Sequence, residues 1–170
     1  MSEPGPDAAG ITLRPAVEGD APAIGAVFDA AVRAGWTYLG DLAGEPMFTA
    51  EDWEQLVADH QSPNVLLVAV DEAGDVTGYT AVHPEDGELF LLFVHPAQAG
   101  RGIGRALLGA AHDALRAAGC TEAYLFVHEQ NARALAVYAA AGYQQDGSDR
   151  VSDFRGTPTR ELRLLKPLHA

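Results

Sequence analysis

The chain has 170 residues, of which 48% are hydrophobic and 21% are charged, and it carries a formal net charge of −13. This composition is typical of one globular domain with a buried core and excludes a disordered or collagen-like chain. The negative charge disfavours nucleic acid and anionic membrane surfaces as partners and favours a cationic small molecule or peptide.

Residues 1–10 are predicted to form a disordered N-terminal leader, and residues 11–170 a single domain. The leader lacks the basic and apolar regions of a signal peptide, and the longest apolar run, Val65 to Val70, is too short to cross a bilayer. We therefore expect a cytoplasmic protein without a membrane partner. Cys120 is the only cysteine, which excludes an internal disulfide, and we expect it to be a small buried residue.

Hydrophobic periodicity predicts a mixed order of strands and helices, with Asp20 and Thr49 as helix N-caps. The predicted elements of the first half are a strand over 11–16, a helix over 20–34, an irregular polar and aromatic loop over 35–47, a helix over 49–60, two strands within 64–84 and a strand over 88–96. Those of the second half are a helix over 102–118, a strand over 121–129, a helix over 131–142, a turn-rich segment over 144–158 and a last strand over 159–168.

Glycines occupy alternate positions at Gly100, Gly102 and Gly104, after a strand and at the start of a helix. Bare backbone amides and the positive end of a helix dipole predict an anion site there, and phosphate is the usual occupant. The two best-known phosphate loops do not match, because the run lacks the Lys-Ser/Thr pair of a P-loop and has G-x-G-x-G in place of G-x-G-x-x-G.

The stretch VHPAQAGRGIGRALL resembles motif A of the GCN5-related N-acetyltransferase (GNAT) superfamily, whose pattern Q/R-x-x-G-x-G/A follows the fourth strand. Ala99 stands where the family has Gln or Arg. The stretch NARALAVYAAAGY, from Asn131 to Tyr143, is similar to the family's N-x-x-A-x-x-x-Y-x-x-x-G-F/Y pattern after the fifth strand. The resemblance implies an α/β fold with a mixed, mostly antiparallel sheet of six to seven strands, flanked by about four helices and splayed between strands 4 and 5.

The resemblance also implies acetyl-CoA as the cofactor, with its pyrophosphate on the main-chain amides of the glycine run. Arg101 and Arg105 would meet the phosphates, and Asn131 would contact the pantetheine arm or only cap a helix. The arm would pair like a strand with the main chain near Phe93 and Val94, where a backbone N–H would stabilise the oxyanion. The implied cofactor-binding residues are Phe93, Val94, Ala99, Gly100, Arg101, Gly102, Ile103, Gly104, Arg105 and Asn131.

The implied reaction is direct transfer of an acetyl group to a primary amine of a small molecule or peptide. Tyr138 is the candidate acid, because a phenol can protonate the leaving thiolate. Glu88, at the start of the fourth strand, is the first candidate base, and His83 and His128 are alternatives. The histidine spacing indicates no metal site.

The loop between the first two helices is predicted to form the wall of the acceptor site. Its aromatic and acidic side chains suit a cation and are Trp36, Tyr38, Asp41 and Glu45. Two other functions stay open, namely an acyl-CoA sensor without turnover and an O-acyltransferase. We also expect a homodimer in which the apolar strand around Leu162 to Leu165 pairs across an axis.

Overall fold

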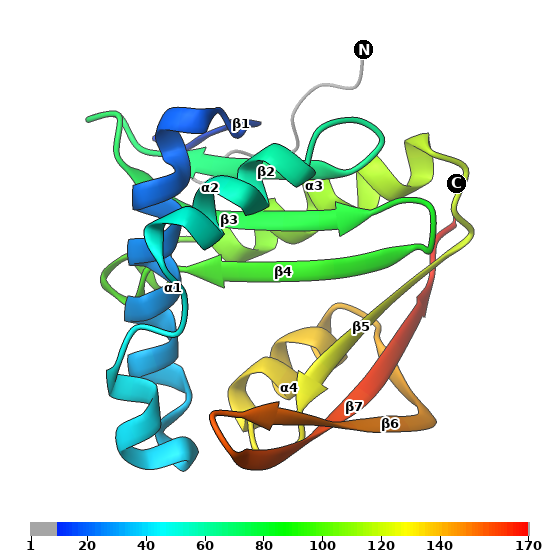
Figure 1. Cartoon of the computed structure of the whole chain (residues 1–170). Coiled ribbons are helices and arrows are strands. Elements are labelled where there is room, and N and C mark those ends of the chain that lie inside the picture. Colours follow the sequence, from blue (N-terminus) through cyan, green and yellow to red (C-terminus); the bar gives the residue numbers. More distant parts are fainter. Residues whose placement is uncertain (1–9, 170) are drawn as a thin grey trace.

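The computed structural model describes residues 10–169, so the predicted leader lies outside the described residues except for Gly10. Seven strands form one sheet in the order β1-β2-β3-β4-β5-β7-β6, and every neighbouring pair is antiparallel except β4–β5 (Figure 1). The strands are β1 (Thr12–Pro15), β2 (Val65–Val70), β3 (Val76–His83), β4 (Glu88–Val94), β5 (Glu122–His128), β6 (Gln144–Phe154) and β7 (Thr157–Pro167). The fold class expected from the sequence is confirmed.

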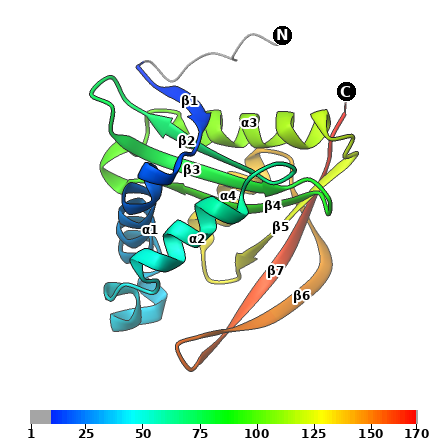
Figure 2. The same ribbon diagram turned by 45° about the horizontal axis from the view of Figure 1, so that its top comes forward.

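Four α-helices of the described chain cover the two faces of the sheet. They are α1 (Ala21–Gly35), α2 (Ala50–Asp59), α3 (Ile103–Ala117) and α4 (Ala132–Ala140). Helices α1 and α2 lie on one face of the β1–β4 half, α3 lies behind that half, and α4 lies behind β5 and β7 (Figures 1 and 2). Thr49 caps α2 as expected, since its hydroxyl accepts from the Asp52 amide. No helix within residues 10–169 has both the length and the apolar character needed to cross a membrane.

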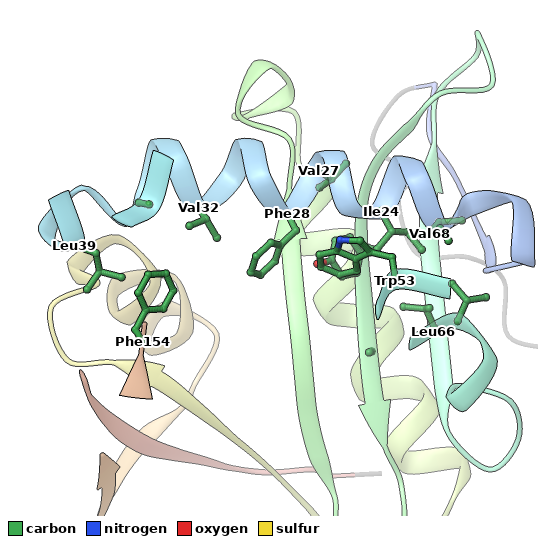
Figure 3. Close-up of a cluster of buried hydrophobic side chains, with 14 residues drawn as sticks. Ile24, Val27, Phe28, Val32, Leu39, Trp53, Leu66, Val68 and Phe154 are labelled. Carbon is green, nitrogen blue, oxygen red and sulfur yellow. The ribbon is translucent and has the colours of Figure 1, made fainter. Parts of the chain in front are cut away.

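Two expectations at helix starts and loops are wrong. The Asp20 carboxylate does not cap α1, because it accepts hydrogen bonds from Arg14 and from the Val17 amide. The segment after α1, expected to be irregular, forms the 3₁₀ helix η2 (Thr37–Gly44), kinked at Gly40. Its Leu39 packs beside Phe154 of β6, so η2 takes its shape from tertiary packing (Figure 3).

The turn-rich segment predicted over 144–158 is mostly the edge strand β6. Its Asp-Gly pair forms a bulge, because the pairing with β7 shifts between Gln145 and Asp149 and Gly147 has φ +88°. The true turn is Arg155-Gly156, whose two positive φ angles suit a two-residue hairpin loop. Nearly all of β6 is exposed, so it lacks the apolar alternation that reveals a half-buried strand.

The expected dimer contact through Leu162 to Leu165 is wrong as well. Strand β7 pairs with β5 on one side and with β6 on the other, which leaves it no free edge. The free edge of this half of the sheet belongs to β6.

Two large apolar clusters divide the core between the halves of the sheet. The first packs α1 and α2 against β2 and β3 and includes Ile24, Phe28, Trp53 and Val68 (Figure 3). The second packs α3 and α4 against β5 and β7 and contains Leu125.

A buried histidine in the second cluster makes stability depend on pH. His112 Nε2 lies 2.7 Å from the Tyr143 hydroxyl, and burial, followed by Lys166 and Arg116, lowers the pKa of His112 from 6.5 to about 4. Because the folded pKa is the lower one, this group stabilises the fold above pH 6.5, and that contribution is lost as the pH falls toward 4.

We therefore expect His112→Gln to reduce the free energy of unfolding at pH 7 and to weaken its decline in acid. The unaltered protein should lose up to about 3 kcal/mol through His112 between pH 7 and pH 4. Urea unfolding of both proteins at pH 7.0, 5.5 and 4.5 measures this. A difference between them that stays constant across these pH values would contradict the assignment.

Candidate active site

The two halves of the sheet meet at β4 and β5, and these strands part after their first residues. In the described chain the strands share one registered pair, Glu88 with Tyr124, and then diverge toward their carboxyl ends (Figure 1). The pairing of β3 with β4 skips Phe90, a bulge that bends β4 where the separation begins. The edge of β4 that faces the gap, through Phe93 and Val94, therefore offers unpaired backbone groups to an extended ligand.

The glycine run lies at the open end of this gap, where β4 leads into α3. Gly100 and Gly102 both have φ +81°, a conformation that other residues rarely adopt. A Cβ on Gly100 would meet nothing within 4 Å, so this turn borders open space. Gly102 is the N-cap of α3 and offers no side chain to its first-turn amides.

The side chains around the run suit an anion of the size of a pyrophosphate. Arg101 and Arg105 are exposed, and within residues 10–169 neither takes part in an ion pair. Ile103 is buried under the run, and a Cβ on Gly104 would lie 3.6 Å from Val94. Ala99 is exposed and adds no polar group. Free helix amides with two unpaired guanidinium groups fit the phosphates of coenzyme A.

Tyr138 lies on α4, on the same face of β5 as α3. Asn131 caps that helix by accepting a hydrogen bond from the Ala134 amide at 3.1 Å, so its capping role is confirmed and its cofactor contact stays a prediction. The Tyr138 ring packs edge-on against Tyr143 at 5.6 Å between centroids. Burial raises the pKa of Tyr138 to about 12, which keeps the phenol protonated at neutral pH. Tyr138 is therefore in the protonated form that a proton donor needs, and its role as the acid stays a prediction.

The opposite face of β5 carries a second polar group, which the sequence did not predict as a unit. The Tyr38 hydroxyl from η2 lies 2.6 Å from His128 Nδ1 at the end of β5. His128 Nε2 lies 3.8 Å from a carboxylate oxygen of Glu161 on β7, and Arg150 of β6 binds the other oxygen of Glu161 at 2.5 Å. Because Nε2 faces a carboxylate, the ring proton belongs on Nε2, and Nδ1 accepts from Tyr38.

Burial sets the charge states of this group. Burial lowers the pKa of His128, and the nearby Glu161 carboxylate partly offsets that effect. Burial, together with Glu161, raises the pKa of Tyr38 above its usual range. At neutral pH the imidazole is therefore neutral and the Tyr38 phenol keeps its proton.

Trp36 places this group at the open end of the gap. Its ring lies 6.3 Å from Phe93 on β4, 4.4 Å from His128 on β5 and 5.7 Å from Phe154 on β6, between centroids. One side chain thus touches both halves of the sheet.

The other predicted acceptor residues lie elsewhere. Asp41 is exposed on η2, and in the described chain no hydrogen bond or ion pair joins it to Tyr38 or His128. Glu45 is also exposed and pairs with Arg155 at 3.4 Å. The structure does not bring these two carboxylates into the group around Tyr38.

Glu88 occupies the closed end of the gap. Phe93 lies five residues further along β4, or about 16 Å at the usual rise of a strand. Glu88 contacts His83 Nδ1 at 3.4 Å, and His83 stacks on Phe90 and contacts His60. His83 and Glu88 therefore form a separate group, far from the open end where Trp36 and His128 meet.

Comparison with known proteins agrees with this architecture. The Acetyltransferase (GNAT) family profile matches residues 30–143. A mycothiol acetyltransferase of Clavibacter michiganensis subsp. michiganensis is 36% identical over 113 residues, which are 65% of this chain and 33% of that protein. One from Stackebrandtia nassauensis is 34% identical over 157 residues, covering 85% of this chain and 48% of the relative.

Solved structures show the same fold. A GCN5-related N-acetyltransferase of Rhodopseudomonas palustris superposes with a TM-score of 0.76 at 23% identity, covering 94% of this chain and 97% of that one. The chain spans only about a third to a half of the length of the two mycothiol acetyltransferases. The family match nevertheless includes β4, the glycine run, β5 and Tyr138. The chain belongs to the acetyltransferase (GNAT) family.

Proposed function

We propose that this chain is an acetyl-CoA-dependent N-acetyltransferase that acts on a primary amine of a small molecule or peptide. The observation that carries the proposal is the gap between β4 and β5, with the glycine run and the uncapped start of α3 at its open end and Tyr138 on the helix that packs against β5. The relatives named mycothiol acetyltransferases support an acetyl acceptor of small size. Bound acetyl-CoA would supply the acetyl thioester.

Each part of the site has a chemical task in this proposal. The first-turn amides of α3, with Arg101 and Arg105, hold the phosphates, while the free edge of β4 orients the arm. Tyr138 Oη gives its proton to the departing sulfur and regains one from the acylated nitrogen. Transfer is direct, because the Cys120 thiol donates to Pro84 O at 3.1 Å and is not available as a nucleophile in the gap.

The acceptor is proposed to be cationic before it reacts. The formal net charge of −13 attracts ammonium compounds, and the Trp36 and Tyr38 rings offer aromatic faces beside Glu161. A cytoplasmic location and a homodimer are further parts of the proposal.

The first experiment separates the open functions. Thermal shifts with acetyl-CoA, CoA and NAD are followed by thiol release over polyamines, amino acids, aminoglycosides and peptides. A shift with acetyl-CoA together with thiol release supports the enzyme. A shift without release from any acceptor favours a sensor, and release with alcohols in the absence of amines favours an O-acyltransferase.

If Arg101 and Arg105 bind phosphates, removing their charges should weaken the binding of ligands that carry phosphates and of no others. Arg101→Gln and Arg105→Gln should each weaken acetyl-CoA binding about 3- to 10-fold, and less at high salt, because each removes one exposed phosphate contact. Binding of a phosphate-free acetyl thioester of cysteamine should not change. The control Arg33→Gln makes the same charge change at an exposed position on α1. Calorimetric affinities for acetyl-CoA equal to that of the control would disprove the assigned phosphate site.

The acid role of Tyr138 predicts a loss in rate without a loss in binding. Tyr138→Phe should lower kcat about 100-fold or more while the dissociation constant of acetyl-CoA stays within about 2-fold. Tyr143→Phe is the matched control, because it removes the neighbouring hydroxyl that contacts His112, and it should reduce stability with kcat unchanged. If Tyr138→Phe keeps full turnover on a good amine at all pH values, the acid role is wrong.

A further inference from the structure

The group around His128 has the order of a proton relay that ends at the open side of the gap. Buried His128 lies between Tyr38 and Glu161, and Arg150 holds the far side of the Glu161 carboxylate. Within residues 10–169 the Tyr38 hydroxyl contacts no hydrogen-bonding group except His128, so it is the end of the group that is left to meet a substrate. His128 lies behind it at 2.6 Å, and Glu161 lies behind His128.

We propose that Tyr38 is the catalytic residue that takes the proton from the substrate ammonium, and that His128 and Glu161 are positioning residues that act through it. The inference rests on the proposed function. As the N–H bond of the ammonium breaks, its proton bonds to Tyr38 Oη. The original phenol proton passes to His128 Nδ1, and the nitrogen keeps its electron pair for attack. The resulting imidazolium faces the Glu161 carboxylate and later returns its proton to solvent.

The charges around the group explain why all three residues are needed. Tyr38 alone is no base, because burial and Glu161 both disfavour its phenolate. It can pass a proton only if His128 accepts one at the same time, and burial keeps that imidazole neutral and ready. The charged group that faces His128 is Glu161 on β7, and the charged group that faces Glu161 is Arg150 on β6. Arg150 holds the carboxylate in place.

The position of the relay favours it over Glu88. β5 residues alternate between the two faces, so Val127 joins the apolar cluster that contains Tyr138, and His128 lies on the other face. Acid and base thus approach the gap from opposite sides. Glu88, at the closed end and against His83, has no such position.

The relay matters only for an amine that arrives protonated. At pH 7 an aliphatic amine with a pKa near 10 is neutral in about one molecule per thousand. In an analogue with fluorine on the carbon adjacent to the one that bears the nitrogen, the amine has a much lower pKa, so this analogue arrives neutral. We therefore compare kcat/KM for an active aliphatic amine and its fluorinated analogue, using the full chain.

Tyr38→Phe and His128→Gln should each lower kcat/KM for the aliphatic amine about 100- to 1000-fold at pH 7, and for the fluorinated analogue less than 10-fold. The loss should shrink about tenfold per pH unit as the pH approaches the pKa of the amine. The double variant should be no worse than either single variant, because one relay is lost in each case. The control His169→Gln, an exposed histidine after β7, should change neither rate.

Glu161→Gln tests the positioning role through the pH profile. The acidic limb of kcat/KM should lie below the usual histidine range, because burial lowers the pKa of His128. Removing the carboxylate takes away the effect that raises this pKa, so the limb should move to lower pH while the plateau falls. Nitrogen NMR of labelled histidine should show His128 neutral at pH 7, with its proton on Nε2.

Several results would overturn the relay. If the protein is active and its Tyr38→Phe and His128→Gln variants keep rates within threefold on the aliphatic amine, the relay is overturned and the proposed function is not. A ring proton on Nδ1 of His128 has the same consequence. Equal losses for both amines also overturn it, since they indicate a merely structural role. A protein that binds acetyl-CoA but acetylates no amine overturns the proposed function together with the relay.

Discussion

The parting of β4 from β5 is the constraint on which the rest of the structure depends. Parallel strands in a sheet normally share a row of hydrogen bonds, and here the pairing stops after Glu88 and Tyr124. Backbone groups left unpaired inside a protein cost free energy unless another partner reaches them. The fold therefore carries a place for an extended ligand in the middle of its sheet. The two halves must be held together by other contacts, and Trp36 bridges them by packing on Phe93 of one half and on His128 and Phe154 of the other.

The pleat of β5 separates the two groups that are proposed to transfer protons. Neighbouring residues of a strand point to opposite faces, so Val127 and His128 differ by one position but face different helices. Tyr138 stands on the side of α3, where the phosphates would bind, and Tyr38 stands on the side of η2. A ligand with phosphates and a ligand with an amine can thus enter from opposite faces and meet in the gap. Neither has to pass the other.

The sequence predicted the four α-helices, six of the strands and the position of the glycine run at the start of α3, because each leaves a local signal. Apolar periodicity marks α3 and β4, and two motifs with fixed spacing identify the superfamily. Strand β6 was missed because an exposed edge strand shows no alternation and contains an Asp-Gly pair that usually marks a turn. The contact between Tyr38 and His128 was missed because the two residues are 90 positions apart. Glu161 lies opposite His128 only in the β5–β7 register, which no local pattern encodes.

The proposed acceptor side is held by residues far away in sequence, whereas the proposed cofactor side is held by neighbouring elements. Helix η2 packs Leu39 against Phe154 at the tip of the β6–β7 hairpin (Figure 3). Arg155 of the turn contacts Glu45 and the carbonyl of Pro46. The glycine run depends instead on β4 and α3, which are consecutive in sequence. A change at the hairpin tip would therefore act on the position of Tyr38 and not on the glycine run. If the proposed function holds, the acceptor site can vary in this fold independently of the site for the acetyl donor.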